Sequence, residues 1–508
     1  MADYRHKNQK RKNNPDAGLA SYNYKFQEPV KYGYDPHLDP QLIWSGKAER
    51  SSFDVATVSL HIHERVSTQA ILKSVQRAEK TLQLKLFAEP DLSLDKRIEF
   101  YRHEMDWANR LILGDSLLVI NSLLERELMA GKVQMIYMDP PYGVAYNSNF
   151  QPFVNRRDVR DGQDDSLTRE PEQIKAYRDT WTLGIHSYLT YLRDRLRLCR
   201  ELLHETGSIF VQISDQNIHH IRELMDEVFG PQNFCRIIAF KKTGYQSSRL
   251  LPSNYDYLIW YAKDISQVKY RPVYRPKEES GAIVGQDLWI EDESGRRRLK
   301  RDEQPPPNSK LFRHRTVFSL GETPAGSYEF KFDGRVFVPP PNKHWSISKE
   351  AMKRLAEKRR LIVIGKSLRF IEYIEDFPVS PIGSVWHDTV RSGFGESQLF
   401  VVQTNTKVVA RCILMTTDPG ELVFDPTCGS GTAAYVAEQY GRRWITCDTS
   451  RVAVAIARQR LMTARFAHYK LANPERGVSA GFVYDEVPHI SIGDIAENKS
   501  PKTELLYD

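Results

Sequence analysis

Short apolar runs and longer amphipathic stretches alternate along most of the chain. Seven runs of mostly apolar residues predict strands, at 110–115, 133–139, 207–214, 234–241, 255–262, 421–425 and 443–448. Six stretches with apolar residues at helical spacing predict amphipathic helices, at 116–130, 187–203, 216–229, 406–417, 431–440 and 450–466. This alternation of strands and helices predicts a doubly wound α/β domain.

The alternation stops between 264 and 395, where charged runs and proline triplets replace it. Because the regular pattern then resumes, we predict one α/β domain that is interrupted by a second module. The predicted divisions are a basic disordered arm (1–40), an N-terminal extension (41–109) with a helix at 66–87, two parts of the α/β domain (110–263 and 396–470), the inserted module (264–395) and a C-terminal extension (471–508).

Composition narrows the class of protein. The 508 residues are 41% hydrophobic and 27% charged, which is ordinary for a globular protein, and the net charge of +7 argues only weakly for a polyanionic partner. No apolar run reaches the roughly 18 residues of a membrane helix, and no apolar segment follows the basic N-terminus. The five cysteines are scattered without CxxC spacing and no histidine cluster has metal-ligand spacing, so we expect a cytoplasmic chain without a metal.

The stretch 135–142, MIYMDPPY, ends a buried-looking strand in an acid, two prolines and an aromatic ring. Prolines lack the N–H donor that a central strand needs, so Pro140 and Pro141 fix the backbone where the sheet stops. The result is a stiff platform that presents the Asp139 carboxylate, a main-chain carbonyl without a strand partner and the Tyr142 ring. Such a platform suits a flat molecule that bears an amine.

A second motif, Gly429-x-Gly431-x-x-Ala434, lies between a predicted strand and a predicted helix, and Asp448 closes the next strand. The glycines allow a sharp turn and a close approach of a ligand to the backbone, while the acid can accept both hydroxyls of a ribose. Taken alone, the motif fits an NAD-dependent dehydrogenase and an S-adenosylmethionine enzyme about equally. Both motifs are predicted at the carboxyl ends of parallel strands, where open α/β sheets bind ligands.

With the two motifs in this order, the chain resembles the amino-group DNA methyltransferases that modify adenine N6 or cytosine N4. It is most similar to their permuted group, in which DPPY precedes the glycine motif, and the type III modification subunits share that motif order. LILGD, MIYMDPPY, GSIFVQI, RIIAFKK and YDYLIWYAKD resemble strands three to seven of the family, and FDPTCGSGT and RWITCD resemble strands one and two. The resemblance covers most of 110–466 and implies a circularly permuted, seven-stranded methyltransferase sheet with an inserted target-recognition domain.

The resemblance also implies a catalytic set, formed by Asp139, Pro140, Pro141 and Tyr142. Asp139 and the Pro140 carbonyl would accept the two N–H bonds of an exocyclic amine during attack on the cofactor's methyl group. Tyr142 would stack on a base that has been flipped out of the duplex.

The implied cofactor is S-adenosylmethionine. Its expected contacts are Asp115, Lys407, Asp425, Thr427, Cys428, Gly429, Gly431 and Asp448. Within this set Asp448 would hold the ribose, Asp115 would lie near the adenine and Lys407 would approach the methionine carboxylate. Thr427 departs from the family, which usually has Phe there, so a ring contact is lost or comes from elsewhere, with Phe424 as the candidate.

The implied partner is double-stranded DNA. The insert would read base edges while basic residues hold phosphates, for which the candidates are Arg296, Arg297 and Arg298. The polar loop at 143–180 would close over the DNA, and its candidate contacts are Phe153, Arg156 and Arg157. The resemblance further allows a homodimer and a separate restriction or helicase subunit, and it implies no membrane partner.

The expected product is N6-methyladenine, made for restriction–modification or phage defence. Family members that modify cytosine N4 usually carry Ser at the position of Asp139, whereas adenine enzymes carry Asp. Three alternatives remain open: methylation of cytosine N4, a catalytically idle DNA-binding subunit of a defence complex, and methylation of RNA or protein amines. An NAD-dependent dehydrogenase would leave the DPPY motif unexplained.

Overall fold

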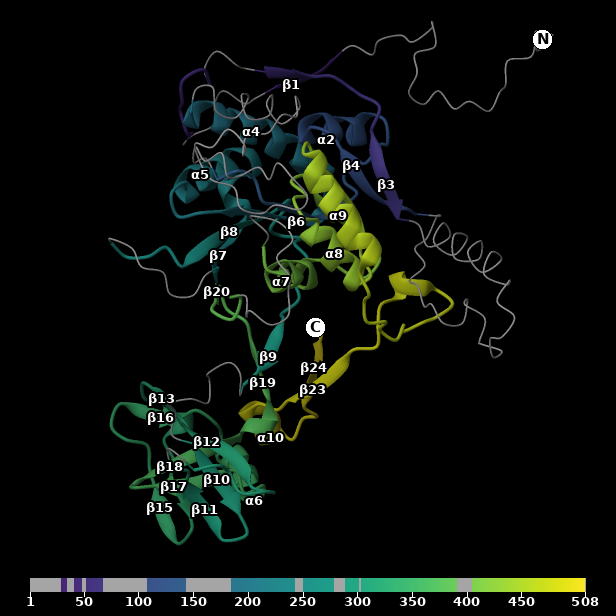
Figure 1. Ribbon diagram of the computed structural model, residues 1–508. Coiled ribbons are helices and arrows are strands. Elements are labelled where there is room, and N and C mark those ends of the chain that lie inside the picture. The colour runs from purple at the N-terminus through teal and green to yellow at the C-terminus, as the bar shows by residue number, and fades with distance from the viewer. Residues whose placement is uncertain are drawn as a thin grey trace, which may run out of the picture. The chain divides into compact units, whose positions relative to one another are not determined.

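Figure 1 shows the computed structural model, which describes residues 29–33, 41–47, 52–66, 107–142, 184–242, 250–277, 288–300, 303–390 and 404–507. The chain divides into two compact units: the first comprises 1–271 and 384–483, and the second comprises 272–383 and 484–508. The inserted part of the second unit, 272–383, is therefore shorter than the predicted insert of 264–395. It also includes the last part of the predicted C-terminal extension.

A nine-stranded sheet forms the centre of the first unit, in the order β20-β7-β8-β6-β5-β21-β22-β4-β3. In that order its strands are β20 (Val385–Trp386), β7 (Phe234–Lys241), β8 (Tyr255–Ala262), β6 (Leu203–Ile213), β5 (Val133–Met138), β21 (Leu422–Asp425), β22 (Arg443–Asp448), β4 (Asn109–Leu113) and β3 (Ile62–Val66). The five strands from β6 to β4 run parallel, and β8 is antiparallel to both of its neighbours. All seven predicted strands lie side by side, which confirms the permuted doubly wound sheet; the edge strands β3 and β20 were not predicted.

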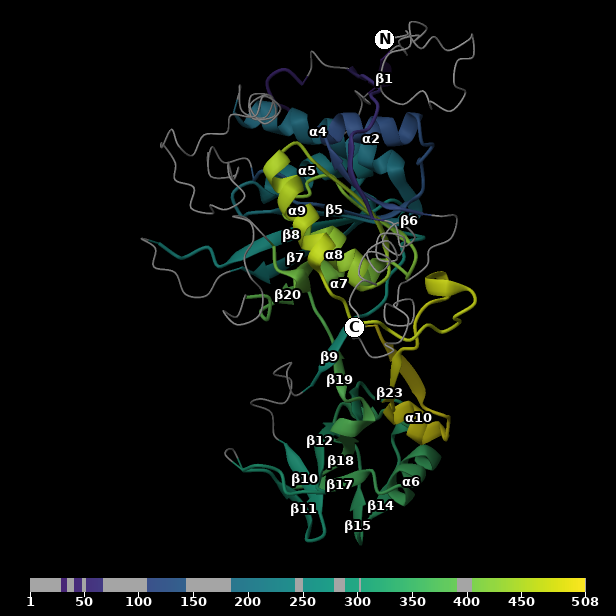
Figure 2. The same ribbon diagram turned by 45° about the vertical axis from the view of Figure 1, so that its right-hand side comes forward.

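Helices cover both faces of this sheet, as Figures 1 and 2 show, with α2, α4 and α5 on one face and α7, α8 and α9 on the other. Their bounds are α2 (Ser116–Glu125), α4 (Ile185–Leu202), α5 (Ile218–Phe229), α7 (Thr406–Thr416), α8 (Thr432–Gln439) and α9 (Arg451–Thr463). The helix predicted at 116–130 ends early because Leu128 adopts a positive φ of 51°, which a helix cannot contain.

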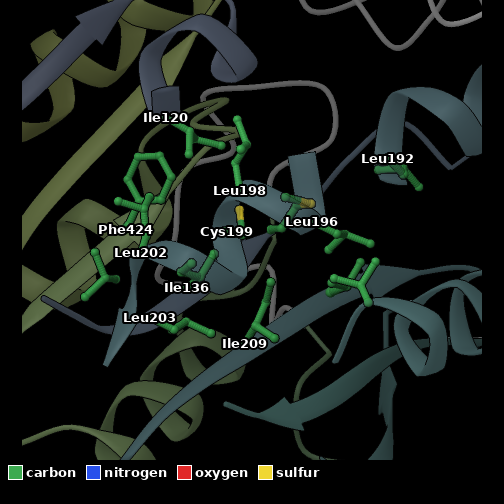
Figure 3. Close-up of a cluster of buried hydrophobic side chains, with 14 of the residues drawn as sticks. Ile120, Ile136, Leu192, Leu196, Leu198, Cys199, Leu202, Leu203, Ile209 and Phe424 are labelled. Atoms are coloured by element: carbon green, nitrogen blue, oxygen red, sulfur yellow. The ribbon is translucent and has the colours of Figure 1, made fainter. Parts of the chain in front are cut away.

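The largest apolar core lies between the sheet and the α2–α4–α5 layer (Figure 3). Leu192, Leu196 and Cys199 of α4 follow helical spacing and are fully buried, together with Ile136 of β5 and Ile209 of β6. All six residues of β5 are buried, as expected for a central parallel strand that is covered on both faces. Each buried aliphatic side chain contributes roughly 1.5–3 kcal/mol, so the strand that leads into DPPY has a rigid base.

Part of the N-terminal region packs on this domain. Strand β1 (Val30–Gly33) pairs antiparallel with β2 (Ser52–Val55), and the Tyr32 hydroxyl donates to Asn121 Oδ1 of α2 at 2.6 Å. The prediction of a disordered arm is therefore wrong for 30–33. Residues 1–28, the loop at 143–180 and the helix predicted at 66–87, apart from its first residue, lie outside the described residues.

A five-stranded antiparallel sheet, in the order β11-β10-β12-β18-β17, organises the second unit. Its strands are β11 (Gly295–Arg298), β10 (Trp289–Asp292), β12 (Lys310–Thr316), β18 (Ser367–Tyr373) and β17 (Leu361–Ile364). Four two-stranded pairs accompany it: β9 (Tyr274–Pro276) with β19 (Val379–Pro381), β13 (Phe318–Leu320) with β16 (Lys343–Trp345), β14 (Phe330–Phe332) with β15 (Arg335–Phe337), and β23 (Asp485–His489) with β24 (Lys502–Leu506).

The C-terminal residues belong to this unit because α10 (Ile492–Glu497) packs on α6 (Lys349–Glu357). Ile495 enters an apolar core with Trp345 and Met352, all three less than a tenth exposed. The predicted C-terminal extension, 471–508, is thus divided between the two units, with 484–508 in the second. The apolar residues of α10 could not reveal from sequence alone which module they cover.

Candidate active site

A cavity of about 430 Å³ opens at the carboxyl ends of β5, β21, β22 and β4, within the first unit. Both sequence motifs line it. Of the predicted catalytic and cofactor residues, the lining includes Asp115, Asp139, Pro140, Pro141, Tyr142, Asp425, Thr427, Cys428, Gly429 and Asp448. The fold thus brings together two motifs that lie almost three hundred residues apart in the chain.

The turn after β21 is held by hydrogen bonds between its backbone and two acids. The Thr427 N–H donates to Asp425 Oδ1 at 2.9 Å, and the Gly429 N–H donates to Asp448 Oδ2 at 2.8 Å. Gly429 has a φ of 51°, in the left-handed region that favours glycine. Asp448 also accepts the Ser450 N–H with its other oxygen at 2.8 Å, and it lines the cavity.

Gly431 is absent from the cavity lining, although its neighbours Ser430 and Thr432 belong to it. It caps α8 with a φ of 72°, and a Cβ there would lie 3.0 Å from the Cβ of Ala457 on α9. The residue therefore allows α8 and α9 to pack closely, and its contact with a cofactor stays a prediction.

Burial changes the protonation of the groups in this turn. It raises the pKa of Asp425 to about 7, and it raises the pKa of the Cys428 thiol well above its ordinary value. Cys428 is therefore a neutral thiol in the cavity wall and not a nucleophile.

Asp115 is fixed at the opposite side of the cavity. Its Oδ1 caps α2 by accepting the Leu117 N–H at 2.7 Å, and both of its oxygens lie 2.8 Å from Nη2 of the buried Arg195. The Arg195 guanidinium stacks 3.5 Å from the centre of the Tyr191 ring, and Tyr191 lines the cavity. Tyr191 thus supplies an aromatic wall, whereas the expected substitute, Phe424, is fully buried in the core.

Asp139 directly follows β5 and is held by two threonines. Its N–H donates to Thr427 Oγ1 at 2.7 Å, and its Oδ2 accepts the Thr404 hydroxyl at 3.1 Å. Burial raises the pKa of Asp139 to about 8; the nearby carboxylates of Asp256 and Asp425 add to the rise, and the hydrogen bond from Thr404 opposes it.

Tyr142 is anchored at both ends of the residue. Its carbonyl accepts Asn217 Nδ2 at 2.7 Å, and its hydroxyl accepts Gln212 Nε2 at 2.5 Å. The same hydroxyl makes a long hydrogen bond of 3.4 Å to Asp256, whose other oxygen is 2.7 Å from Lys242 Nζ. Burial keeps the pKa of the Tyr142 phenol well above its ordinary value, so the hydroxyl stays protonated.

Several predicted contacts are not brought to this cavity. Lys407 does not line it, and its Nζ lies 3.3 Å from Asp388 with the side chain 53% exposed. In the second unit, Arg296 donates to the carbonyls of Arg359 and Leu361.

The other two arginines of the cluster also have partners. Arg297 pairs with Glu303, and Arg298 also has a partner within the structure. Each arginine of the cluster thus has a partner within the structure, and its contact with phosphates stays a prediction. Phe153, Arg156 and Arg157 lie outside the described residues.

Sequence reasoning missed the residues that support the two motifs. These are Tyr191, Arg195, Gln212, Asn217, Lys242, Asp256 and Thr404. Two of them carried a usable signal, because Gln212 and Asp256 are single polar residues inside apolar strand runs, and a buried polar group needs a partner. The other five lie in helices and loops whose polarity is unremarkable.

Two searches over the described residues were negative. Among them, no group of three or more His, Cys, Asp or Glu side chains could hold a metal ion. No helix in the described ranges is long and apolar enough to cross a membrane.

Comparison with known proteins gives consistent matches. A family model described as a DNA methylase, N6_N4_Mtase, matches residues 133–459. The chain is 26% identical over 380 residues to the type II methyltransferase M.EcaI of Enterobacter cloacae, a match that covers 70% of each protein. It is 24% identical over 362 residues to the type III restriction-modification enzyme EcoP15I Mod subunit of Escherichia coli, covering 64% of this chain and about half (55%) of that subunit.

Solved structures also align with the chain. The PvuII DNA methyltransferase (cytosine-N4-specific) is 13% identical, with a TM-score of 0.33, over 77% of this chain and 92% of that one. A complex of M1.HpyAVI with S-adenosylmethionine is 12% identical, with a TM-score of 0.32, over 69% of this chain and 98% of that one.

Proposed function

Since this chain belongs to the DNA methylase family that comprises adenine-N6 and cytosine-N4 enzymes, we propose that it methylates N6 of adenine in double-stranded DNA. The methyl donor of the family is S-adenosylmethionine. The observation that best supports this reaction is that one cavity is lined both by the Asp139–Tyr142 platform and by the glycine turn.

The residues of the cavity fit the donor. Asp448 lines the cavity as the acid that would hold the ribose hydroxyls, the Gly429 backbone allows close approach, and Tyr191 offers a flat wall beside Asp115 for the adenine. When bound, S-adenosylmethionine supplies an activated methyl group on a positively charged sulfur.

The platform fits an exocyclic amine. Such an amine is a poor nucleophile because its lone pair is delocalised into the ring of the base. Asp139 would accept one N–H and the Pro140 carbonyl the other, which localises the lone pair and stabilises the positive charge that develops on nitrogen. This role requires the ionised form of Asp139.

Tyr142 would hold the base by stacking. Extrusion of a base from the duplex costs a few kcal/mol of free energy, and stacking of the base on an aromatic ring offsets roughly 1–3 kcal/mol of this cost. The hydrogen bonds at the Tyr142 hydroxyl and carbonyl fix the ring for this contact.

Adenine is preferred over cytosine because Asp139 occupies the motif position at which adenine enzymes of the family carry Asp. We further propose that the second unit, 272–383 with 484–508, reads the DNA sequence. The relatives named as type II methyltransferases and as a type III Mod subunit support a role in restriction–modification, with DNA cleavage by a separate restriction subunit.

One substitution and one product analysis test the proposal. Asp139→Ala should reduce single-turnover methyl transfer to methylation-free plasmid DNA by on the order of 10²-fold or more, with nearly unchanged affinity for S-adenosylmethionine. Asp264→Ala is the matched control, because Asp264 is a partly exposed acid that does not line the cavity. Activity of Asp139→Ala within a few-fold of wild type would refute the role, and N4-methylcytosine without N6-methyladenine in the nucleoside digest would refute the product.

A further inference from the structure

Gln212 is a polar side chain that is only 4% exposed, within the apolar stretch 209–213 of β6. Its amide joins three hydroxyl groups at the floor of the cavity. Oε1 accepts the Tyr137 hydroxyl at 2.6 Å and the Thr404 hydroxyl at 3.2 Å, and Nε2 donates to the Tyr142 hydroxyl at 2.5 Å. Of these partners, Tyr142 is part of the platform and Thr404 donates to the platform's Asp139.

The bond from Nε2 determines how the Tyr142 hydroxyl is used. Because the phenol oxygen accepts a hydrogen bond from Gln212, its own hydroxyl must donate elsewhere, and its acceptors in the structure are Asp256 and the Asp139 carboxylate. Asp256 is in turn ion-paired with Lys242. The far end of the Tyr142 ring is therefore held between β6 and β8.

The Thr404 hydroxyl has one proton and two acceptors within reach, Asp139 Oδ2 at 3.1 Å and Gln212 Oε1 at 3.2 Å. Tyr137 already donates to Oε1 at the shorter distance of 2.6 Å. The Thr404 proton is thus available to Asp139, where a bond to a carboxylate is stronger than a bond to a neutral amide.

We propose that Gln212 is a positioning residue for methyl transfer, which fixes the Tyr142 ring and leaves the Thr404 hydroxyl to the Asp139 carboxylate. This inference rests on the proposed methyltransferase function. Gln212 touches neither reacting atom in this arrangement; it acts through Tyr142 and Thr404.

The first test replaces Gln212 by a residue of similar length without polar groups. Gln212→Met should lower the single-turnover rate on methylation-free plasmid DNA by about 10- to 100-fold, the scale for a misplaced reacting group. The affinity for S-adenosylmethionine should stay within about twofold of wild type, since the cofactor turn keeps its own hydrogen bonds.

The chain offers a matched control in Gln134. It is also a 4% exposed glutamine on a neighbouring central strand, it donates to the carbonyls of Thr206 and Thr416, and it does not line the cavity. Gln134→Met should lose stability without a comparable loss of rate. Equal rate losses in the two variants would overturn the positioning role.

A double-mutant cycle separates a specific role from general damage. Tyr142→Phe removes the hydroxyl that Gln212 holds, so the effect of Gln212→Met should be at least severalfold smaller in that background. Additive effects would overturn the proposal.

The second test uses the pH profile and keeps the proposal testable if Gln212→Met fails to fold. Tyr137→Phe frees Gln212 Oε1 to attract the Thr404 proton, so Asp139 loses a hydrogen bond and the midpoint of its pH–rate profile should rise by about one unit. The other titratable groups that face Asp139 are Asp256, Asp425, Tyr137, Tyr142 and Tyr188. All but Tyr137 are unchanged in this variant.

The outcomes distinguish the inference from the function on which it rests. The positioning role is overturned if the pH–rate midpoint of Tyr137→Phe is unchanged, or if the rate of Gln212→Met is within twofold of wild type. In either case, methyl transfer by the wild-type chain still supports the proposed methyltransferase function. A wild-type chain that transfers no methyl group to plasmid DNA overturns both.

Discussion

Methyl transfer by this chain should become faster as the pH rises, because only the ionised Asp139 can accept a hydrogen bond from the amine. Burial raises the pKa of Asp139 to about 8, whereas an unperturbed Asp titrates near pH 4. At neutral pH the cofactor-free site therefore holds mostly the neutral acid. A neutral acid offers a donor where the reaction needs an acceptor.

The size of the effect follows from this pKa. With a midpoint at pH 8, the ionised fraction of Asp139 is about 0.09 at pH 7 and about 0.91 at pH 9, so the rate should rise about tenfold over this interval. The positive sulfur of bound S-adenosylmethionine favours the ionised carboxylate. The midpoint in the complex with cofactor and DNA should therefore lie at or below 8, with the same rise across two units centred on it.

The assay is single-turnover transfer of a labelled methyl group to methylation-free plasmid DNA, with saturating cofactor and constant ionic strength, from about pH 5.5 to about pH 9.5. Asp139→Asn is the control, because the amide keeps an acceptor oxygen but cannot ionise. Its profile should be flat, and its rate should be lower than wild type at high pH.

Two results would refute this reasoning. A wild-type rate that does not rise over the whole range would mean that the ionisation of Asp139 does not limit the reaction. A rise that persists in Asp139→Asn would assign the titration to another group. The candidates would then be Asp256, whose pKa is raised by burial, and Asp425, whose pKa burial raises to about 7.

Three further substitutions follow from the structure. Thr427→Val should destabilise the fold by roughly 1–3 kcal/mol, because it leaves the Asp139 N–H without its acceptor; urea unfolding measures the loss, and Thr427→Ser, which keeps a hydroxyl, should recover most of it. Gly431→Ala should cost about 1–3 kcal/mol in thermal unfolding, since it combines a φ of 72° with a Cβ only 3.0 Å from that of Ala457; an unchanged melting temperature would contradict this packing role. Arg296→Ala should lower the stability of the second unit, because it removes two hydrogen bonds to backbone carbonyls. The slope of log affinity for DNA against log salt concentration should change by less than about one, the value for one phosphate contact. A fall in this slope of about one or more would show that Arg296 contacts DNA.

The sheet could be predicted from the sequence because its strands carry strong local signals. β5 is buried on both faces and is therefore an unbroken apolar run up to Asp139. The prolines and glycines that end β5 and β21 then mark the edge at which both motifs meet. These features depend on neighbouring residues, so periodicity and turn chemistry are enough to find them.

The supporting contacts could not be predicted in the same way, because each joins residues that are far apart in the chain. Gln212 and Thr404 are separated by 192 positions and Tyr142 and Asp256 by 114, so their pairing depends on strand order and register. The same limit applies to charged residues. A run of three arginines looks the same in sequence whether its side chains face solvent or, like that of Arg296, donate to backbone carbonyls of residues more than sixty positions away.

Thr427 shows how a departure from a family pattern can be compensated by the fold. A Phe at this position would bring a ring to the glycine turn but no acceptor for the Asp139 N–H. Thr427 accepts that N–H across 288 positions of sequence, while its own N–H donates to Asp425. The flat wall of the cavity comes instead from Tyr191, which Arg195 holds in place. The cofactor turn and the catalytic platform are thus joined by a directional hydrogen bond. A shift of the turn on cofactor binding should therefore also displace the backbone of Asp139.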